Sequence, residues 1–183
     1  MMSKNIISSP NQKKEATGEI NIQTFNLIKK LGQGAYGKVY LANIKASRSK
    51  HEFAIKILSK DFLCKTNKVK SVFREKELLC ENKTSAFLPK FYHSFHDETN
   101  LYIVMEYIPN GTLQNLISKQ PSGFSKSAIQ FFSAQIIFVL EYLQSQKTAH
   151  RDLKPANIMI SDNFYIKVID FGEAKKYEET QSQ

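Results

Sequence analysis

The alternation of apolar and polar residues divides the chain into a strand-rich half followed by a helical half. Runs with a period of two residues predict strands at 25–31, 39–44, 53–58, 91–95 and 101–107. In the third strand this period places Lys56 on the face opposite Phe53 and Ile55. Strands that come first and helices that follow indicate the α+β class, with an antiparallel sheet.

Three segments have the periodicity of helices, and a pair of short strands follows them. The segments are 68–81, a short stretch around 113–117 and a long one over 125–145, and the short strands are 158–160 and 166–169. One stripe of the long helix contains Ile129, Phe132, Ile136, Leu140 and Leu143, and a neighbouring stripe contains Phe131, Phe138 and Tyr142. A helix apolar over so much of its circumference is normally buried among other elements.

Composition separates a leader from one folded domain. Residues 1–22 are rich in Ser, Asn, Lys and Gln with little periodicity, which predicts a disordered N-terminal leader. The remainder, 23–183, has the length of one domain. Within it we expect a first lobe over 23–107, a hinge at 106–111 and a partial second lobe over 112–183.

Charge and apolar content narrow the class of protein. The net charge is +9, but the basic residues are scattered and no nucleic-acid-binding pattern is present, so we expect no nucleic-acid partner. A solvated basic surface is the simpler interpretation, and a polyanion site is the alternative. The longest apolar run is too short and too polar to span a bilayer, and the N-terminus lacks an apolar signal core. We therefore expect a soluble, cytoplasmic protein, with Cys64 and Cys80 as reduced thiols.

A glycine-rich turn joins the first two predicted strands. It reads Gly32-Gln33-Gly34-Ala35-Tyr36-Gly37-Lys38-Val39, which fits G-x-G-x-x-G-x-V. Glycine lets a backbone approach phosphates closely, because no Cβ intervenes. A strand follows the motif here, whereas a Rossmann turn would open a helix. The turn is therefore a candidate phosphate cradle, and a ligand-free hairpin turn is the alternative.

A lysine lies inside the apolar third strand, nineteen residues after Gly37. Lys56 needs a partner if it is buried. Glu75, nineteen residues further on in the predicted helix, is the first choice, and Glu77 is the second. An exposed edge strand is the alternative interpretation.

The most specific stretch follows the long helix. It reads His150-Arg151-Asp152-Leu153-Lys154-Pro155-Ala156-Asn157, and Asp170-Phe171-Gly172 begins eighteen residues after Asp152. Phosphoryl transfer from ATP needs a carboxylate that accepts the proton of the attacking hydroxyl, and oxygen ligands for magnesium. Asp152 is the candidate base, Lys154 a candidate contact of the transferring phosphate, and Asn157 and Asp170 candidate Mg²⁺ ligands. A loop that only caps the long helix is the alternative.

These motifs, in this order, resemble the signatures of the protein kinase superfamily. The Asp-Leu-Lys-Pro-x-Asn form resembles the serine/threonine branch, and four further phrases are similar to the AGC group, closest to the phosphoinositide-dependent kinases. They are Ala54-Ile55-Lys56-Ile57-Leu58, Asn110-Gly111, Leu140-Glu141-Tyr142-Leu143 and Asp170-Phe171-Gly172-Glu173-Ala174-Lys175. The resemblance implies a kinase-like fold with ATP and Mg²⁺ as cofactors.

The resemblance also implies where the nucleotide would bind. The residues that would sandwich the adenine are Leu31, Val39, Ala54 and Met159. Met105 would be the gatekeeper, and the backbone of Glu106 and Ile108 would hydrogen-bond the ring. Thr112 departs from the many relatives that carry an acid there to meet the ribose.

AGC kinases of this kind also dock a phosphorylated hydrophobic peptide beside the αC helix. The residues that could form such a pocket here are Lys60, Leu63, Val69, Val72, Arg74 and Lys76. An ordinary helix surface is the alternative.

The chain contains no Ala-Pro-Glu after Gly172, so we expect an incomplete version of a longer kinase. Phe131, Ile137 and Phe138 of the long helix would then form an exposed apolar patch. Two functions remain: a serine/threonine kinase that phosphorylates proteins, and a catalytically incompetent, pseudokinase-like module that acts by binding nucleotide. Every catalytic position is intact, which favours kinase ancestry.

Overall fold

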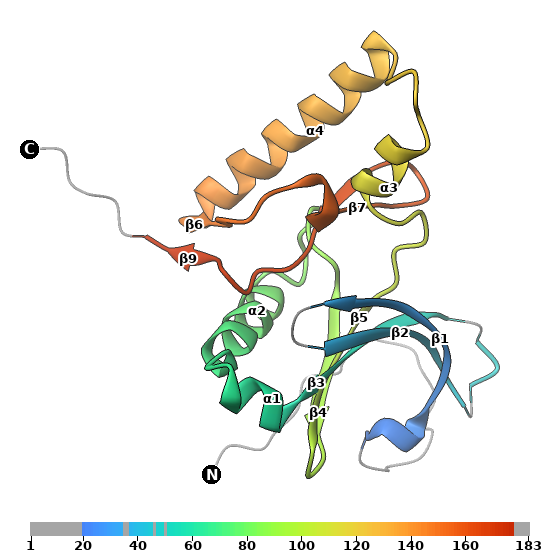
Figure 1. Ribbon diagram of the computed structural model, residues 1–183, viewed down its shortest axis with the longest axis vertical. Helices are drawn as coiled ribbons and strands as arrows, with labels where there is room; N and C mark the ends of the chain where they lie inside the picture. The colour runs from blue at the N-terminus through green and yellow to red at the C-terminus, as the bar shows by residue number, and fades with distance from the viewer. Residues whose placement is uncertain (1–19, 35–36, 46, 50, 178–183) are drawn as a thin grey trace, which may run out of the picture.

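The computed structural model describes residues 20–34, 37–45, 47–49 and 51–177 (Figure 1). Its first half is a five-stranded antiparallel sheet with the order β1-β2-β3-β5-β4. The strands are β1 (Phe25–Gly34), β2 (Gly37–Ile44), β3 (Phe53–Ser59), β4 (Phe91–His96) and β5 (Asn100–Glu106). All five predicted strands are present.

Two helices follow β3 and precede β4, namely α1 (Lys60–Lys65) and α2 (Val69–Glu81). The sequence predicts α2 but not α1, which is only six residues long and begins where the Ser59 hydroxyl accepts from the Phe62 N–H. The side chain of Leu63 is 1% exposed and attaches α1 to the core beneath α2. A single buried residue is too weak a periodic signal to reveal such a helix.

The sheet separates two hydrophobic clusters, as the alternation of β3 predicts. The cluster on the face that carries α1 and α2 consists of Leu58, Leu63, Val72 and Ile103. The cluster on the opposite face consists of Phe25, Ala42, Phe53, Ile55, Tyr102 and Val104. Both faces of the sheet are therefore covered by apolar side chains, and Lys56 lies on the face that α2 covers.

The predicted leader, 1–22, lies mostly outside the described residues. Its last residues, 20–22, belong to the fold: the Asn21 side chain caps a 3₁₀ turn, η1 (Ile22–Thr24), by accepting from the Gln23 N–H. Ile20 and Ile22 pack against the cluster of Phe25 and Phe53. Folded structure thus begins at least three residues before the predicted boundary.

The second half contains two helices and short strands. The elements are α3 (Leu113–Ser118), α4 (Lys126–Ser145), β6 (Thr148–Ala149), η2 (Pro155–Asn157), β7 (Ile158–Ile160), β8 (Ile166–Val168) and β9 (Lys175–Lys176). β7 and β8 form a hairpin, and β6 pairs with β9. The main core joins the halves, because Leu78 and Leu79 of α2 belong to the same cluster as Leu143 and Phe171.

The buried stripe of α4 differs from the predicted one. Its members are Phe132, Gln135, Val139 and Leu143. Ile129 and Leu140 were placed in the core by the pattern but are exposed, so that part of the prediction is wrong. The reason is Gln135, whose amide donates to the Phe164 carbonyl (3.2 Å) and accepts from the Ile166 N–H (2.9 Å). A polar residue therefore occupies the centre of the buried face because it satisfies the backbone of the β7–β8 hairpin.

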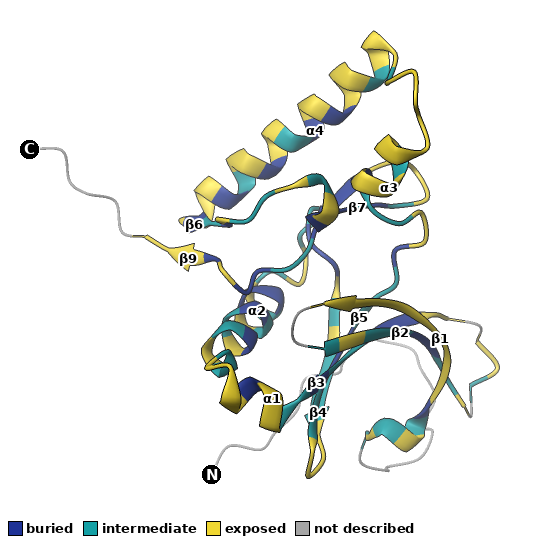
Figure 2. Cartoon of the chain, in the orientation of Figure 1, coloured by how far each residue is buried: buried dark blue, intermediate teal, exposed yellow. Residues whose placement is uncertain are grey.

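The opposite face of α4 is apolar and solvent-facing (Figure 2). Phe131, Ile137 and Phe138 are 44%, 56% and 57% exposed, which confirms the predicted patch. Within the described part of the chain, no helix is long and apolar enough to cross a membrane.

Candidate active site

The strand-rich half supplies an ion pair between β3 and α2. Lys56 Nζ lies 2.7 Å from Glu75 Oε1 and 2.6 Å from Oε2. The side chains are 18% and 6% exposed. The predicted partner is confirmed as Glu75, whereas Glu77 is exposed on another side of α2. Because the pair is shielded from solvent, it fixes α2 against the sheet more strongly than a surface pair would.

The loop between β6 and η2 supplies a second charged group. Lys154 Nζ donates to both carboxylate oxygens of Asp152, at 3.0 and 2.8 Å. Asn157 Nδ2 donates to the Asp152 carbonyl (2.9 Å) and to Oδ2 of the same residue (3.0 Å). The hydrogen bond from Lys154 lowers the pKa of Asp152, and Asn157 adds to the effect. The three side chains of the predicted catalytic loop are therefore in direct contact.

Asp170 begins a turn that lies next to this loop. Its φ is +64°, in the left-handed region that Asp tolerates better than most residues. The pKa of Lys154 is raised by its hydrogen bond to Asp152 and further by the negative charge of Asp170. Phe171 is 1% exposed and belongs to the same core cluster as Leu78 and Leu79 of α2.

His150 holds the loop and the turn together, although the sequence analysis assigned it no separate role. Its Nε2–H donates to the Ile169 carbonyl (3.1 Å), and Nδ1 accepts from the Asp152 N–H (3.2 Å). Since a carbonyl can only accept, this arrangement requires the proton on Nε2. The ring also contacts Phe171 edge-on, with centroids 4.7 Å apart. Its place directly before Arg151-Asp152 was the available signal.

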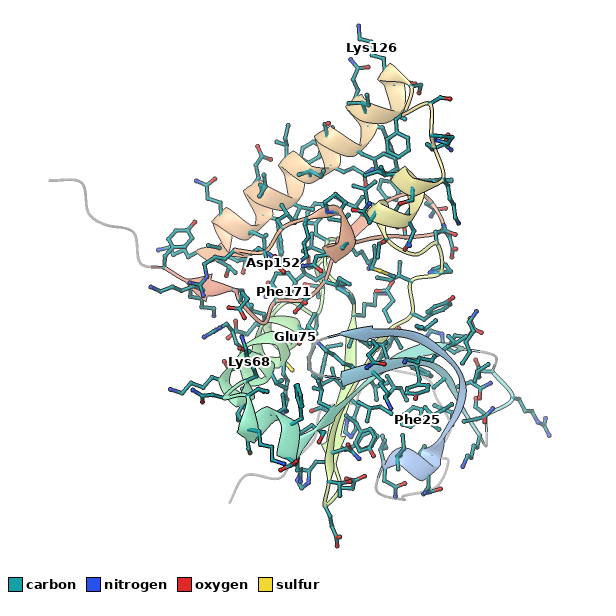
Figure 3. All side chains as sticks on the ribbon, viewed as in Figure 1. Phe25, Lys68, Glu75, Lys126, Asp152 and Phe171 are labelled. Atoms are coloured by element: carbon teal, nitrogen blue, oxygen red, sulfur yellow. The ribbon has the colours of Figure 1, made fainter. Side chains whose placement is uncertain are left out.

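The turn also contacts α2. Arg74 directly precedes Glu75 in α2. Its Nη1 donates to the Gly172 carbonyl (2.9 Å). A Cβ on Gly172 would lie 3.4 Å from Asp170 Oδ1 and 3.7 Å from Ser71 Cβ. Figure 3 shows Glu75, Phe171 and Asp152 following one another in the space between the two halves. A continuous series of contacts thus leads from Lys56 through α2 to Asp170 and Asp152.

The residues expected around an adenine ring come from both halves. Ala54 is 7% exposed and lies opposite Met105 across β3 and β5. Val39 lies opposite Lys56 across β2 and β3. Leu31 is half-exposed on β1, and Met159 of β7 forms a bridge with Thr112.

The glycine-rich turn is described only in part. Gly32, Gln33 and Gly34 end β1, and Gly37 and Lys38 begin β2, whereas Ala35 and Tyr36 lie outside the described residues. Added Cβ atoms on Gly32 and Gly34 would meet no heavy atom within 4 Å. A Cβ on Gly37 would collide with the Ile57 carbonyl, so this glycine is needed for the approach of β2 to β3.

The hinge carries an ion pair that the sequence analysis missed. Lys167 Nζ of β8 lies 2.8 Å from Glu106 Oε2 and 3.3 Å from the Leu88 carbonyl. The side chains of Lys167 and Glu106 are 11% and 24% exposed. The same Glu106 oxygen accepts from the Lys90 N–H (2.9 Å), and the Glu106 N–H donates to the Lys90 carbonyl (2.9 Å). The pair joins β8 of the second half to the end of β5 in the first half, at the hinge.

The predicted peptide pocket is not open as a whole. Leu63 and Val72 are buried in the core under α2. Arg74 is engaged by the Gly172 carbonyl, and Lys60 Nζ donates to the Asp97 carbonyl (2.5 Å). Val69 and Lys76 are partly exposed.

Metal binding would have to rest on few protein ligands. Among the described residues, no group of three or more His, Cys, Asp or Glu side chains is arranged to hold a metal ion. Mg²⁺ differs from zinc in this respect, since one or two protein oxygen ligands together with phosphates and waters suffice. A carboxylate on Asp170 and an amide oxygen on Asn157 therefore fit Mg²⁺ bound together with a nucleotide.

A bilobal fold with a lysine–glutamate pair in the sheet and an Asp-Asn loop beside an Asp-Phe-Gly turn is that of a kinase. The family model for the protein kinase domain matches residues 25–183, and the chain belongs to this family.

The chain is similar to three curated relatives. It is 41% identical over 152 residues to 3-phosphoinositide-dependent protein kinase B of Dictyostelium discoideum. It is 39% identical over 153 residues to the human putative 3-phosphoinositide-dependent protein kinase 2, and 37% identical over 156 residues to the human cAMP-dependent protein kinase catalytic subunit PRKX. These matches cover 83%, 84% and 85% of this chain but 16%, 38% and 42% of the relatives. The predicted similarity to phosphoinositide-dependent kinases is confirmed, and the chain spans less than half of each relative.

Proposed function

We propose that this chain carries the ATP-binding and catalytic residues of a serine/threonine protein kinase, which transfers the γ-phosphate of ATP to protein hydroxyl groups. The observation that carries the proposal is the two-point contact of Lys56 with Glu75 at 2.6–2.7 Å. Kinase catalysis requires this pair to be closed, because the lysine then faces the phosphates in a fixed position. The sequence relationship to serine/threonine kinases supports the choice of substrate hydroxyl.

Asp152 is the proposed base. Its carboxylate is 37% exposed at the surface of the loop, where a substrate hydroxyl could approach. An Asp carboxyl is ionised at neutral pH, and the hydrogen bond from Lys154 lowers its pKa further, so it is in the form that can accept the hydroxyl proton as transfer proceeds. Lys154, which already contacts Asp152, would neutralise charge on the transferring phosphate.

Asn157 and Asp170 are the proposed magnesium ligands. The Asn157 amide nitrogen donates to Asp152, which orients the amide oxygen of the same side chain for a cation. Asp170 is held beside Lys154 by the turn that Phe171 attaches to the core. Mg²⁺ bound there would offset the negative charge of the phosphates.

The proposed adenine site lies between β1–β3 and β7, next to the hinge. Because the Glu106 N–H is donated to Lys90, its carbonyl is the atom of that residue that would accept from the ring. The Thr112 hydroxyl caps α3: it donates to Asn115 Oδ1 (2.6 Å) and accepts from the Asn115 N–H (3.1 Å). A sugar contact at Thr112 would compete with this cap, so we propose none.

Transfer of labelled γ-phosphate tests the proposal. Residues 1–183 are incubated with ATP, Mg²⁺ and a serine/threonine peptide mixture beside an Asp152→Asn control. We expect transfer that falls at least about 100-fold in the control, which should still fold because Asp152 is not buried. Nucleotide-dependent stabilisation with no transfer by either protein would instead favour the nucleotide-binding module.

Docking of a phosphorylated hydrophobic peptide beside α2 is a weaker proposal. Because Leu63 and Val72 are already buried, a peptide would have to exchange their core contacts for its own. These contacts favour an ordinary helix surface. Binding of a phosphorylated peptide that is lost in Lys76→Glu would reverse this preference.

A further inference from the structure

Glu173, the residue directly after the Asp170-Phe171-Gly172 turn, lies among cations from both halves of the molecule. Lys68, at the N-terminal end of α2, donates from Nζ to Glu173 Oε1 (2.9 Å). Arg151 of the catalytic loop donates from Nε to the Glu173 main-chain carbonyl (2.6 Å). The pKa of the Glu173 carboxyl is lowered by its hydrogen bond to Lys68, and the charges of Arg151 and Arg74 act in the same direction.

The cations contact a short length of main chain. Arg74 donates to the Gly172 carbonyl, so α2 and the catalytic loop approach consecutive residues of one turn. Like charges that converge on one place repel one another unless an anion lies between them. Glu173 supplies a carboxylate at that point, 49% exposed, beside a Lys68 side chain that is 31% exposed.

We propose that Glu173 is a positioning residue, an anion built into the chain that holds α2 against the metal-binding turn. Through Arg74 the turn is already in contact with α2, and Glu75 of the same helix holds Lys56. The position of Asp170 and that of Lys56 are therefore coupled through one helix. The inference rests on the proposed function, because it assigns Glu173 to the alignment of the same site.

The chain offers a matched control. Lys176 Nζ of β9 lies 2.6 Å from Glu81 Oε2, and these side chains are 60% and 52% exposed. This pair also joins α2 to the segment after the turn, but at the far end of the helix. This pair tests whether any surface ion pair between these elements is sufficient to hold α2 against the turn.

Binding of a non-hydrolysable ATP analogue to the full chain, measured by calorimetry with Mg²⁺ and with EDTA, tests the proposal. Glu173→Lys adds a cation to the cluster, and we expect the affinity with Mg²⁺ to fall about tenfold while the affinity in EDTA is unchanged. The double variant Lys68→Glu with Glu173→Lys restores the pair and should recover to within about threefold of wild type. Glu81→Lys should change neither affinity by more than about twofold.

Hydrogen exchange provides a readout that needs no nucleotide. The amides of α2 should exchange faster in Glu173→Lys than in Glu81→Lys, and the double variant should restore protection.

The outcomes separate this inference from the proposed function. A wild-type protein that binds no nucleotide would contradict the proposed function, while the exchange experiment would still decide the role of Glu173. Mg²⁺-dependent binding that is normal in Glu173→Lys would overturn the positioning role. An equal loss with and without Mg²⁺, no recovery in the double variant, or the same loss in Glu81→Lys would also overturn it.

Discussion

The strand-rich half and the helical half each place a lysine beside a carboxylate at the site, and the two pairs differ in burial. Lys56 and Glu75 are 18% and 6% exposed, whereas Lys154 and Asp152 are 52% and 37% exposed. A buried pair is costly to break, because its partner remains in a poorly solvated place. An exposed pair rearranges at little cost, which suits groups that must meet a substrate. The first half therefore carries the more rigid of the two pairs, and the second half carries the more accessible one.

Packing differs between the halves in the same sense. Both faces of the sheet are covered by apolar clusters, and α2 contributes Val72 to one of them and Leu78 to the main core. α4 buries one face only and exposes Phe138 and Ile137 on the other. The helical half thus depends on a single packed surface.

Replacing Lys56 and Lys154 in turn should produce the largest difference in stability between the two halves. Lys56→Met removes the ammonium group that pairs with the buried Glu75 carboxylate. We expect the free energy of unfolding to fall by about 3 kcal/mol. Lys154→Met breaks a solvated pair and should lower the free energy of unfolding much less. Urea unfolding followed by circular dichroism measures both. Equal losses would show that burial does not distinguish the two pairs.

A smaller effect should separate the two faces of α4. Leu143 is 4% exposed and Leu140 is 48% exposed, so the same substitution can be made on each face of one helix. Leu143→Ala should lower the free energy of unfolding by about 2–3 kcal/mol, since it removes core contacts and leaves a cavity. Leu140→Ala should change it by no more than about 0.5 kcal/mol. A large loss at Leu140 would mean that this face is covered in solution.

Local patterns were sufficient for the five strands of the sheet and for the β7–β8 hairpin, for α2 and for the pairing of Lys56 with Glu75, but not for the two-residue strands β6 and β9. The strands and α2 follow from the strong periodicity of their apolar residues, and the ion pair follows from one charged residue in an apolar strand. Each of these signals lies within a short stretch of sequence. The extent of α4 was also predictable, but its buried face was not. Apolar residues surround Gln135 on both sides, and only the tertiary structure shows that the hairpin carbonyl and N–H need its amide.

Contacts between distant segments were the least predictable part of the site. The ion pair of Glu106 with Lys167 spans 61 residues of the sequence, and that of Lys68 with Glu173 spans 105. No local sequence pattern indicates which residue is the partner. The resemblance to kinases supplied the expected contacts of the adenine ring, such as Ala54 and Met159. It could not supply pairs that depend on the particular side chains of this chain.

The smallest expected effect concerns the cause of two lowered pKa values, one in each half. Asp97, in the turn between β4 and β5, accepts from the Tyr102 hydroxyl and from the Asn100 N–H, and these neutral donors lower its pKa. Lys154 is the main cause of the lowered pKa of Asp152. Because both pKa values lie below those of the unfolded chain, each carboxylate stabilises the fold above the ordinary pKa of about 4, and this contribution is lost as pH falls through the folded pKa.

Salt distinguishes the two causes. Added salt screens the charge of Lys154, so the pKa of Asp152 should rise toward its ordinary value between low and high ionic strength. The pKa of Asp97 should change less, because hydrogen bonds from Tyr102 and Asn100 carry no net charge for the ions to screen. Carboxyl-carbon NMR titrations at two salt concentrations measure both residues in one sample. If the pKa of Asp97 rises with salt as much as that of Asp152, neutral hydrogen bonds are not its main cause, and the contrast between neutral donors in the sheet turn and a charged donor in the Asp152 loop does not hold.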